Sequence, residues 1–350
     1  MTRELTVSID AMGGDAGPGI VVTALVRAIE RHTHTQFLLH GDEAVLQPLL
    51  AAQPRLAGRV ILRHAPERVT MEDKPSQIVR RGQNTSMWRA IECVKKGEAD
   101  VAVSAGNTGA LMAMSLLQLR TQEGIARPAI ASIWPTMRGR TVVLDVGANV
   151  SATAEQLVDF AIMGEAYAQA VFSLERPIVG LLNVGSEELK GNDAVRAAAQ
   201  ILRSSKLPIA FHGFVEGNDI TEGLVDVVVT DGFTGNIALK TAEGAAKLVA
   251  GYLRRALKRS LLGMLGAVIA AGALNALKRN LDPRAQAGGI FLGLNGLVVK
   301  AHGGTDEIGF SGALSLGVDM ARADIISRIA ADRRKLDAGA NHEQEQAALT

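Results

Sequence analysis

Cysteine and aromatic residues are scarce in this chain, and each scarcity excludes a class of protein. A single cysteine, Cys93, cannot build a disulfide framework within the chain. It lies in a stretch with helical character, RAIECVKKG, where we expect a small core residue rather than a nucleophile. Aromatic residues make up 3% of the sequence, so the core must be aliphatic and little is available for stacking nucleic-acid bases. The net charge of +1 also argues against a broad nucleic-acid surface, and we predict no nucleic-acid partner.

Targeting and nucleotide-binding signals are missing as well. The first residues, MTRELTVSIDAMGG, lead almost directly into a strand and contain no apolar signal-peptide core, so we expect a cytoplasmic protein. The two glycine-containing turns described below lack the G-K-[ST] ending of a Walker loop and the G-x-G-x-x-G dinucleotide fingerprint. These absences disfavour a dehydrogenase.

Apolar residues are plentiful, at 47% of 350 residues, which is enough for a sizeable core. Short branched runs alternate with helical patterns along most of the chain. This alternation predicts the α/β class, with parallel strands joined by right-handed crossovers. We expect one large catalytic domain over residues 1–335 and a polar tail over residues 336–350.

The stretch DVVVTDGFTGNIALK, residues 226–240, carries the clearest local signal. Three consecutive valines suit a strand buried on both faces, and a helical pattern begins beyond Gly235. The free N–H groups and the dipole at such a helix start favour an anion. Asp231, Thr234 and Asn236 add a carboxylate, a hydroxyl and an amide, and Lys240 lies one turn further on. A plain strand–turn–helix connection with polar caps explains this stretch equally well.

A second stretch, ADVAVSAGNTGAL at residues 99–111, has the same design. Its small polar turn follows a buried run and precedes an apolar helix. Two such turns at one sheet edge would cradle a phosphate from both sides. Polar residues recur at other strand ends too, which suggests one shared site: Asp10, Ser104, Asp145, Asn183, Glu216 and Asp231.

Six sequence blocks make this signal specific, and they cover nearly the whole chain. They are IDAMGGD (9–15), VSAGNTGALM (103–112), LDVGAN (144–149), LLNVGSEELKGN (181–192), VVVTDGFTGN (227–236) and VKAHG (299–303). In this order they resemble the bacterial phosphate acyltransferase (PlsX) family. The resemblance implies a three-layer α/β sandwich with a mostly parallel sheet, similar to the phosphotransacetylases and the isocitrate and isopropylmalate dehydrogenases.

The same resemblance implies a reaction. Acyl-[acyl carrier protein] and inorganic phosphate give acyl phosphate and free carrier protein, in bacterial phospholipid synthesis. A homodimer, peripheral association with an anionic membrane surface and a downstream glycerol-3-phosphate acyltransferase are implied partners. Two other functions stay open: a phosphotransacetylase acting on acyl-coenzyme A, and a non-catalytic membrane-associated scaffold for lipid synthesis.

This reaction needs little machinery, because phosphate is already a competent oxygen nucleophile. The enzyme must hold phosphate, orient the thioester and stabilise an oxyanion. Lys190, in the SEELKGN turn, is the first choice for a catalytic lysine, and Lys240 is the second. We add Asn236 and His302 to the catalytic prediction, although a structural histidine is an equal alternative.

The predicted phosphate- and substrate-binding set collects the polar and glycine residues of these turns. It comprises Asp10, Gly13, Gly14, Asp15, Ser104, Gly106, Asn107, Thr108, Asp145, Asn149, Asn183, Gly185, Glu187, Glu216, Asp231, Gly232, Thr234 and Lys240. The aspartates lack the spacing of a defined metal site, so we predict no metal and no cofactor.

One late stretch, residues 253–279, is amphipathic and then almost wholly apolar. It allows three interpretations: a buried dimer helix, a transmembrane span, or the tip of a helical hairpin over residues 245–282 that dips into a membrane surface. The predicted membrane tip comprises Leu261, Met264, Leu265, Val268 and Ile269. For a homodimer, the apolar stripes of residues 245–257 and 312–329 are the expected contact.

Overall fold

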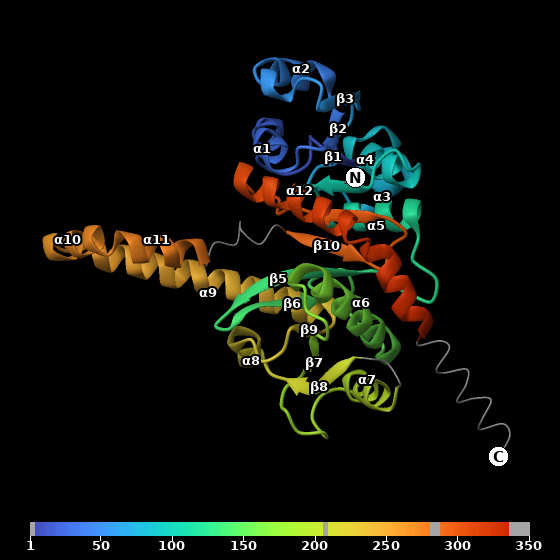
Figure 1. Ribbon diagram of the computed structural model, residues 1–350, viewed down its shortest axis with the longest axis vertical. Helices are drawn as coiled ribbons and strands as arrows, with labels where there is room; N and C mark the ends of the chain where they lie inside the picture. The colour runs from blue at the N-terminus through green and yellow to red at the C-terminus, as the bar shows by residue number, and fades with distance from the viewer. Residues whose placement is uncertain (1–3, 206–208, 281–287, 336–350) are drawn as a thin grey trace.

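The computed structural model describes residues 4–205, 209–280 and 288–335. Its strands are β1 (Leu5–Asp10), β2 (Thr35–Gly41), β3 (Val60–His64), β4 (Val101–Ser104), β5 (Ala129–Thr136), β6 (Gly139–Leu144), β7 (Ile178–Leu182), β8 (Ala210–Val215), β9 (Val227–Val229), β10 (Gly289–Leu292) and β11 (Leu297–Lys300). Its helices are α1 (Pro18–Arg31), α2 (Glu43–Ala51), α3 (Pro75–Arg81), α4 (Ser86–Lys95), α5 (Thr108–Leu119), α6 (Ala154–Phe172), α7 (Asp193–Ser204), α8 (Gly217–Glu222), α9 (Gly232–Lys258), α10 (Leu261–Ile269), α11 (Ala271–Asn280) and α12 (Glu307–Arg322), with 3₁₀ turns η1 (Pro54–Leu56) and η2 (Gly82–Asn84). Within these ranges the strands form one 11-stranded sheet in the order β3-β2-β1-β4-β11-β10-β5-β6-β9-β7-β8 (Figure 1).

The strands form from short runs of apolar residues, and the run in β9 shows why. Val227, Val228 and Val229 are all buried, because both faces of the sheet are covered. Alternate side chains point to opposite faces. Val227 and Val229 therefore join one apolar core, and Val228 joins the other.

Helices supply the two outer layers. The first core packs residues of α1, α6, α7 and α12 against one face of the sheet. The second packs residues of α3, α4, α5 and α8 against the other face. The predicted three-layer α/β sandwich with a mostly parallel sheet is confirmed in these respects.

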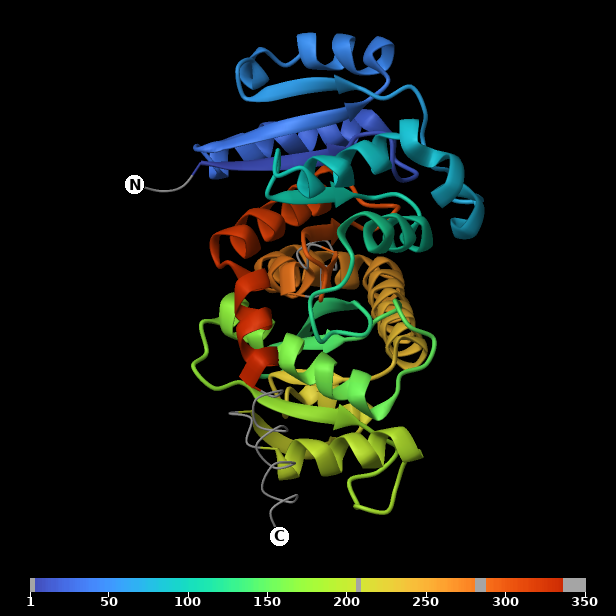
Figure 2. The same cartoon turned by 90° about the vertical axis from the view of Figure 1, so that its right-hand side faces the viewer.

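Strand direction changes in the middle of the sheet. The pairs β11–β10, β10–β5 and β5–β6 are antiparallel, and the other neighbouring pairs are parallel. Three successive reversals leave β6, β9, β7 and β8 running opposite to β4 and β11 along the ladder. The sheet thus has two parallel halves, with the N-terminal strands at one end and β7 and β8 at the other, joined by the antiparallel strands β10 and β5 (Figure 2).

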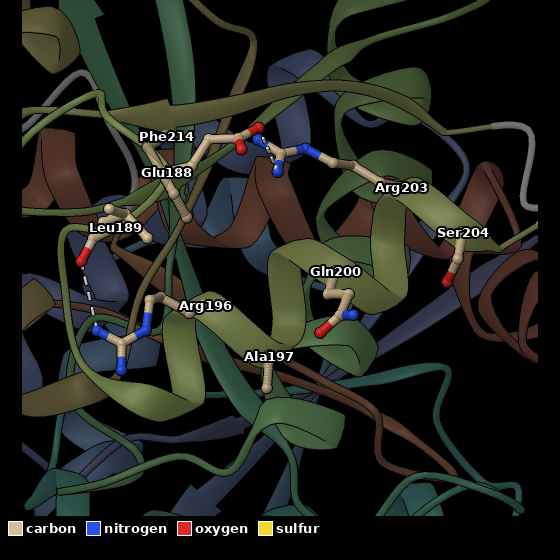
Figure 3. Close-up of a pocket in the computed structure, with 8 residues that line it drawn as sticks. All are labelled: Glu188, Leu189, Arg196, Ala197, Gln200, Arg203, Ser204 and Phe214. Carbon is tan, nitrogen blue, oxygen red and sulfur yellow. Dashed lines mark hydrogen bonds and ion pairs between the residues drawn. The ribbon is translucent and has the colours of Figure 1, made fainter.

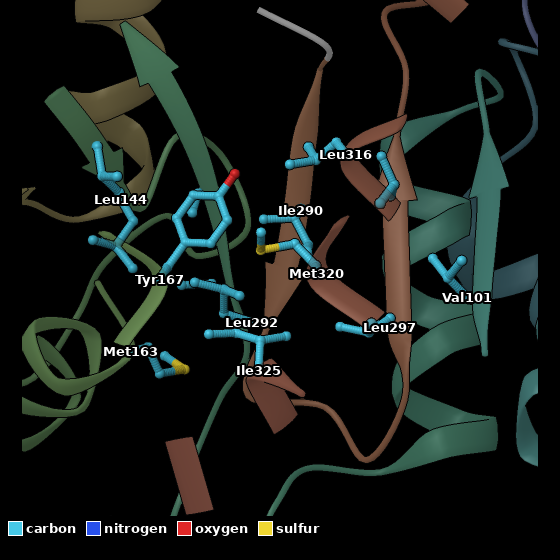
Figure 4. Packing of buried hydrophobic residues seen from close by; sticks show 14 of the residues in the cluster. Val101, Leu144, Met163, Tyr167, Ile290, Leu292, Leu297, Leu316, Met320 and Ile325 are labelled. Atoms are coloured by element: carbon cyan, nitrogen blue, oxygen red, sulfur yellow. The ribbon is translucent and has the colours of Figure 1, made fainter. Parts of the chain in front are cut away.

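The two halves share one continuous core. Tyr167 of α6 lies beside Ile290 of β10 and Met320 of α12, and Met163 lies one turn earlier on α6 (Figure 4). All four side chains are buried. The antiparallel junction is therefore covered by helices from both halves, which fixes the halves relative to each other.

Helix α9 leaves this body as a long arm. Of its 27 residues, Gly232 and Gly235 are the buried ones, and both lie in its first turn. Helices α10 and α11 turn back along it, so the described part of residues 245–282 is a helical hairpin that projects from the body (Figure 1). Residues 281–282 lie outside the described ranges. In the part of the chain that the structure describes, no helix has the length and apolar character that a bilayer-spanning segment needs.

One expectation needs correction, and one falls outside the described residues. The prediction of a dimer surface over residues 312–329 is wrong, because α12 packs against α1 and β11 and buries Ala313, Leu314 and Val318 completely. The predicted polar tail, residues 336–350, lies outside the described ranges.

Candidate active site

Asp10, at the end of β1, ties together the first group of predicted site residues. Its carboxylate accepts hydrogen bonds from the hydroxyl groups of Ser86 (2.6 Å) and Ser104 (2.7 Å). The N–H of Met12 adds a longer one at 3.3 Å. Burial raises the pKa of Asp10, and the serine hydrogen bonds oppose that rise. With 1% of its surface exposed, Asp10 fixes the ends of β1 and β4 to the start of α4.

Lys300, at the end of β11, is a residue of this group that sequence reasoning missed. Its ammonium donates to the carbonyl oxygens of Ala105 (3.2 Å) and Ala301. Burial lowers its pKa to about 8, while the charges of Asp10 and Asp15 act in the opposite direction. The available signal was the position of this lysine in the VKAHG block, directly after a run of apolar residues. A charge at the end of a buried strand needs hydrogen-bond or ion-pair partners.

The glycines after β1 allow the backbone to approach this group closely. A Cβ on Gly13 would lie 2.4 Å from Asp10 Oδ2 and 2.8 Å from the N of Gly106. Gly14 has a φ of +91°, which favours glycine. Asp15 donates its N–H to the carbonyl of Gly303 at 2.9 Å, and its own side chain is exposed. The turns after β1, β4 and β11 therefore meet, which brings the predicted residues Asp10, Gly13 and Ser104 together with Lys300.

Asn107 has a different role from the free phosphate ligand that the sequence predicted. Its Oδ1 accepts from the N–H of Ala110 at 3.0 Å and caps α5. Its Nδ2 donates to the carbonyl oxygens of Met71 (2.9 Å) and Asp73 (3.5 Å). Both ends of the amide are thus engaged, and Asn107 attaches the segment before α3 to the start of α5. Thr108, the first residue of α5, is half-buried at this turn.

A second group of residues surrounds Asp145, at the end of β6. The carboxylate of Asp145 accepts from the N–H groups of Ile130, Gly147, Ala148 and Asn149 and from the side-chain amide of Asn149, at 2.7–3.1 Å. Burial raises its pKa, and these hydrogen bonds oppose the rise. Such a saturated carboxylate has little capacity left for a ligand. Asp145 and Asn149 shape the turn from within.

The start of α9 lies directly on this turn. The N–H of Gly232 donates to the carbonyl of Asn149 at 2.7 Å, and a Cβ on Gly232 would lie 2.6 Å from the same oxygen. Asp231 caps α9 by accepting from the N–H and the hydroxyl of Thr234, both at 2.9 Å. This arrangement confirms the predicted strand–turn–helix geometry of residues 226–240.

Asn236 is an exposed polar residue of this turn. A Cβ on Gly147 would lie 3.7 Å from the Asn236 side chain, so the two turns touch here. Within the described ranges the Asn236 amide makes no hydrogen bond, in contrast to Asn107 and Asn149. Its donor and acceptor are therefore available to a ligand.

The loop after β7 contains Lys190. Asn183 closes this loop by donating its Nδ2 to the carbonyl oxygens of Gly185 and Lys190, both at 3.1 Å. Gly185 is buried under the loop, and a Cβ there would lie 2.6 Å from Glu187 Oε2 and 3.2 Å from Lys190 Cγ. The Lys190 side chain is exposed and has no ion-pair partner among the described residues. Because β7 lies beside β9, this loop adjoins the start of α9.

A cavity of about 660 Å³ lies on the other side of this loop, between the loop and α7. Arg203 pairs with Glu188 at 3.1 Å, and Arg196 donates to the carbonyl of Leu189 at 3.4 Å (Figure 3). These contacts occupy both guanidinium groups in holding the loop. The cavity is therefore where the loop is anchored, and the predicted site residues do not line it.

Glu216 has a structural role. It begins α8 in a reciprocal capping box with Asp219, whose carboxylate accepts from the N–H of Glu216 at 2.7 Å. The expectation that all six turns contribute to one shared site stays a prediction.

Helix α9 starts on the Asp145 turn of the second group, and its charged side chains act on the first group. The pKa of His302, after β11, is lowered by partial burial and then by the positive charge of Lys240; Glu243 opposes this, and Lys247 adds to it. The charges on the third to fifth turns of α9 therefore act on the turn after β11. Lys240 itself pairs with Glu243 at 3.0 Å. His302 Nδ1 accepts from the N–H of Gly304 at 3.2 Å, which leaves the proton of the neutral ring on Nε2.

The remaining cysteine and the possible metal ligands lie as follows. Cys93 is buried and its thiol pKa is raised by burial, which agrees with the core role predicted for it. Among the described residues, no three His, Cys, Asp or Glu side chains are grouped so as to share a metal ion.

Comparison with known proteins identifies the family. Residues 5–328 match the family model described as "Fatty acid synthesis protein". A phosphate acyltransferase of Parvibaculum lavamentivorans is 57% identical over 337 residues, covering 96% of this chain and 93% of its own length. The chain belongs to the phosphate acyltransferase family. A second member, from Maricaulis maris, is 56% identical over 351 residues and covers 99% of both chains.

Family membership confirms the recognition made from the six sequence blocks. The protein is an acyltransferase of lipid synthesis. The solved structure of the EutD phosphotransacetylase from Staphylococcus aureus has a TM-score of 0.58 at 16% identity, covering 92% of this chain and 95% of its own. A phosphotransacetylase from Streptococcus pyogenes has a TM-score of 0.57 at 18% identity, covering 92% and 94%. At this identity the likeness shows the fold alone, and it agrees with the fold class predicted.

Proposed function

We propose that the protein transfers the acyl group of an acyl-[acyl carrier protein] to inorganic phosphate. The products are acyl phosphate and free carrier protein. The observation that carries the proposal is the unpaired amide of Asn236 at the start of α9, one turn before Lys240 and on the helix that passes the His302 turn. This helix start offers an anion the positive end of the helix dipole and the neutral amide donor of Asn236.

The proposed chemistry is direct displacement at the thioester carbon. A phosphate oxygen bonds to the carbonyl carbon, a tetrahedral oxyanion forms, the C–S bond breaks, and the thiolate leaves and takes up a proton. Donors aimed at the oxyanion stabilise this transition state most. We assign that role to Asn236, with Lys190 balancing the charge of phosphate or of the departing thiolate. His302, with a donor on Nε2 and a lowered pKa, donates to phosphate or to the carbonyl as a neutral group.

The remaining binding residues divide into two kinds under this proposal. Thr108, Asp15, Glu187 and Lys240 have exposed or half-buried polar groups that a substrate can reach. The others act by shaping the turns: Asp10, Gly13, Gly14, Ser104, Gly106, Asn107, Asp145, Asn149, Asn183, Gly185, Glu216, Asp231, Gly232 and Thr234.

One experiment tests the donor. Acyl phosphate formation is measured with palmitoyl-[acyl carrier protein] and with palmitoyl-coenzyme A, each with and without phosphate. We expect a higher kcat/KM with the carrier protein and no product without phosphate. A preference for coenzyme A would favour the phosphotransacetylase alternative. If lipid synthesis in cells survives Asn236→Ala and Lys190→Ala together, the non-catalytic scaffold is the better account.

We also propose that the arm brings the protein to a membrane surface as a homodimer on the cytoplasmic side. At the tip, Leu261 and Leu262 are each 82% exposed, Ile269 78% and Val268 73%. Arg254, Arg255, Lys258 and Arg259 immediately precede them and are exposed. Apolar residues beside a basic cluster suit an anionic lipid surface. The exposed flank of α9, with Leu248, Val249 and Tyr252, is the proposed contact between copies.

This location fits the chemistry of the product. A long-chain acyl phosphate is amphipathic and reactive toward hydroxyl groups. An enzyme that acylates glycerol 3-phosphate at the same membrane is therefore the proposed downstream partner.

A further inference from the structure

An open apolar groove of about 530 Å³ lies between α3 and α5. Its walls include Pro75 and Val79 of α3 and Ala113 and Leu117 of α5. Leu117 is 54% exposed, and the neighbouring Leu116, also in the groove, is 37% exposed. These residues are not part of the apolar core, because the buried residues of α5 lie on the opposite side of the helix.

One end of the groove adjoins the proposed phosphate turn. Pro75 lies over the first turn of α5, where a Cβ on Gly109 would be 2.8 Å from Pro75 Cγ. Asn107, the cap of α5, also holds the backbone just before α3 through Met71 and Asp73. The groove therefore begins next to the turn after β4 and continues along α5, which at 12 residues is about 18 Å long.

The charges at the groove have one sign. Arg80 of α3 and Arg120, at the end of α5, are its charged lining residues. Both are exposed, and neither has an ion-pair partner among the described residues. A ligand with an apolar chain and an anionic carrier complements this lining. The groove volume lies within the range of about 300–1,000 Å³ typical of small-molecule sites.

We propose that this groove binds the acyl chain of the donor, with the thioester end at the β4–α5 turn. The inference rests on the proposed acyl transfer to phosphate. It adds the site at which the enzyme discriminates between acyl chains of different length. Its occupant is an acyl chain, because the lining is apolar and one end of the groove lies at the β4–α5 turn. Each methylene that leaves water for the groove is expected to improve kcat/KM by about fourfold until the groove is filled.

The test uses Ala113→Trp, which places an indole inside the groove, and Gln77→Trp as the matched control. Gln77 is an exposed residue of α3 that does not line the groove. Phosphate-dependent transfer is measured with butyryl and palmitoyl donors on the same carrier. In Ala113→Trp we expect kcat/KM for the palmitoyl donor to fall by tenfold or more while that for the butyryl donor stays within about twofold. Gln77→Trp should keep the wild-type ratio.

The outcomes separate this inference from the proposed function. If wild-type protein transfers neither acyl group to phosphate, the proposed function fails. If transfer is normal and Ala113→Trp affects both chain lengths equally, the groove does not bind the chain. Should Ala113→Trp fail to fold, Leu117→Asp replaces it, since that side chain is half-exposed, and the same loss of chain-length preference is expected. A Leu117→Asp protein that changes its sedimentation coefficient but keeps its chain-length preference would assign the groove to a contact between copies and overturn the inference.

Discussion

The ammonium of Lys300, at the end of β11, donates to the carbonyl oxygen of Ala105, in the turn after β4, at 3.2 Å. These residues lie 195 positions apart in the chain. The contact fixes a turn of the proposed phosphate site to a buried positive charge, and the charge interacts favourably with Asp10 and Asp15. The burial of this ammonium predicts that the free energy of unfolding depends on pH.

The sign of that dependence follows from the direction of the shift. Burial lowers the pKa of Lys300 from 10.5 to about 8, so between those values the unfolded chain binds more protons than the folded one. Stability then rises with pH across this window, and the cost of the buried charge is fully present below about pH 8. We expect the unfolding free energy of wild type relative to Lys300→Met to increase by up to about 3 kcal/mol between pH 8 and 10.5. If denaturant titrations show a constant difference in unfolding free energy between the two proteins over this range, Lys300 is not a buried charge.

Asn236 and Asn107 should differ in what they do, although both are asparagines at helix starts. Asn236→Ala should lower kcat by about 10²–10³-fold, as loss of an oxyanion donor does, and leave the melting temperature unchanged because its amide has no partner in the described chain. Asn107→Ala should cost about 1 kcal/mol of stability through loss of the α5 cap. Calorimetry and initial rates on both variants check this, with Asn218→Ala, an exposed asparagine of α8, as control. Equal losses of stability in the two variants would contradict the assignment of a catalytic role to Asn236 and a structural role to Asn107.

Lys190 lies in a loop held by Asn183, and its own side chain is exposed. Lys190→Ala should lose about 2–4 kcal/mol of transition-state stabilisation with little change in melting temperature. The exposed Lys95 of α4 provides the control, and Lys95→Ala should match wild type in both measurements. A lower melting temperature with normal turnover would make Lys190 a structural residue.

The arm should bind vesicles through its tip. Leu261 and Leu265 are 82% and 58% exposed, so replacing both with Glu should release the protein from anionic vesicles without disturbing the fold. Salt should weaken the binding of wild type, because the arginines and lysines before the tip act through screened charges. A control with Val45→Glu and Met137→Glu, exposed apolar residues on the body, should bind like wild type.

Two readouts decide between lipid and protein as the partner of the arm. The tip variant should remain a dimer in sedimentation and retain acyl transfer. If it instead becomes monomeric or unfolds, the tip is a protein interface and the membrane proposal fails.

Local patterns in the sequence determined the elements and much of the candidate site. Runs such as Val227–Val229 predicted strands, because a run without polar residues must be covered on both faces. Asp231 and Asn107 sit at predicted helix starts and do cap them, since a cap needs only residues two or three positions away. The six blocks were specific enough to identify the family, because their order and content go beyond what a single turn requires.

The tertiary structure decided which of those turns meet. Three antiparallel pairs in mid-sheet join the two parallel halves, and a strand's own sequence does not encode the direction of its neighbour. Only the packed chain brought the charges of α9 to act on His302, tied Asn107 to Met71, and buried Lys300 against Ala105. The fold also buries the apolar stripe of α12 and leaves that of α9 exposed. An apolar stripe indicates that a helix packs against something, and the tertiary structure determines whether that surface belongs to the same chain.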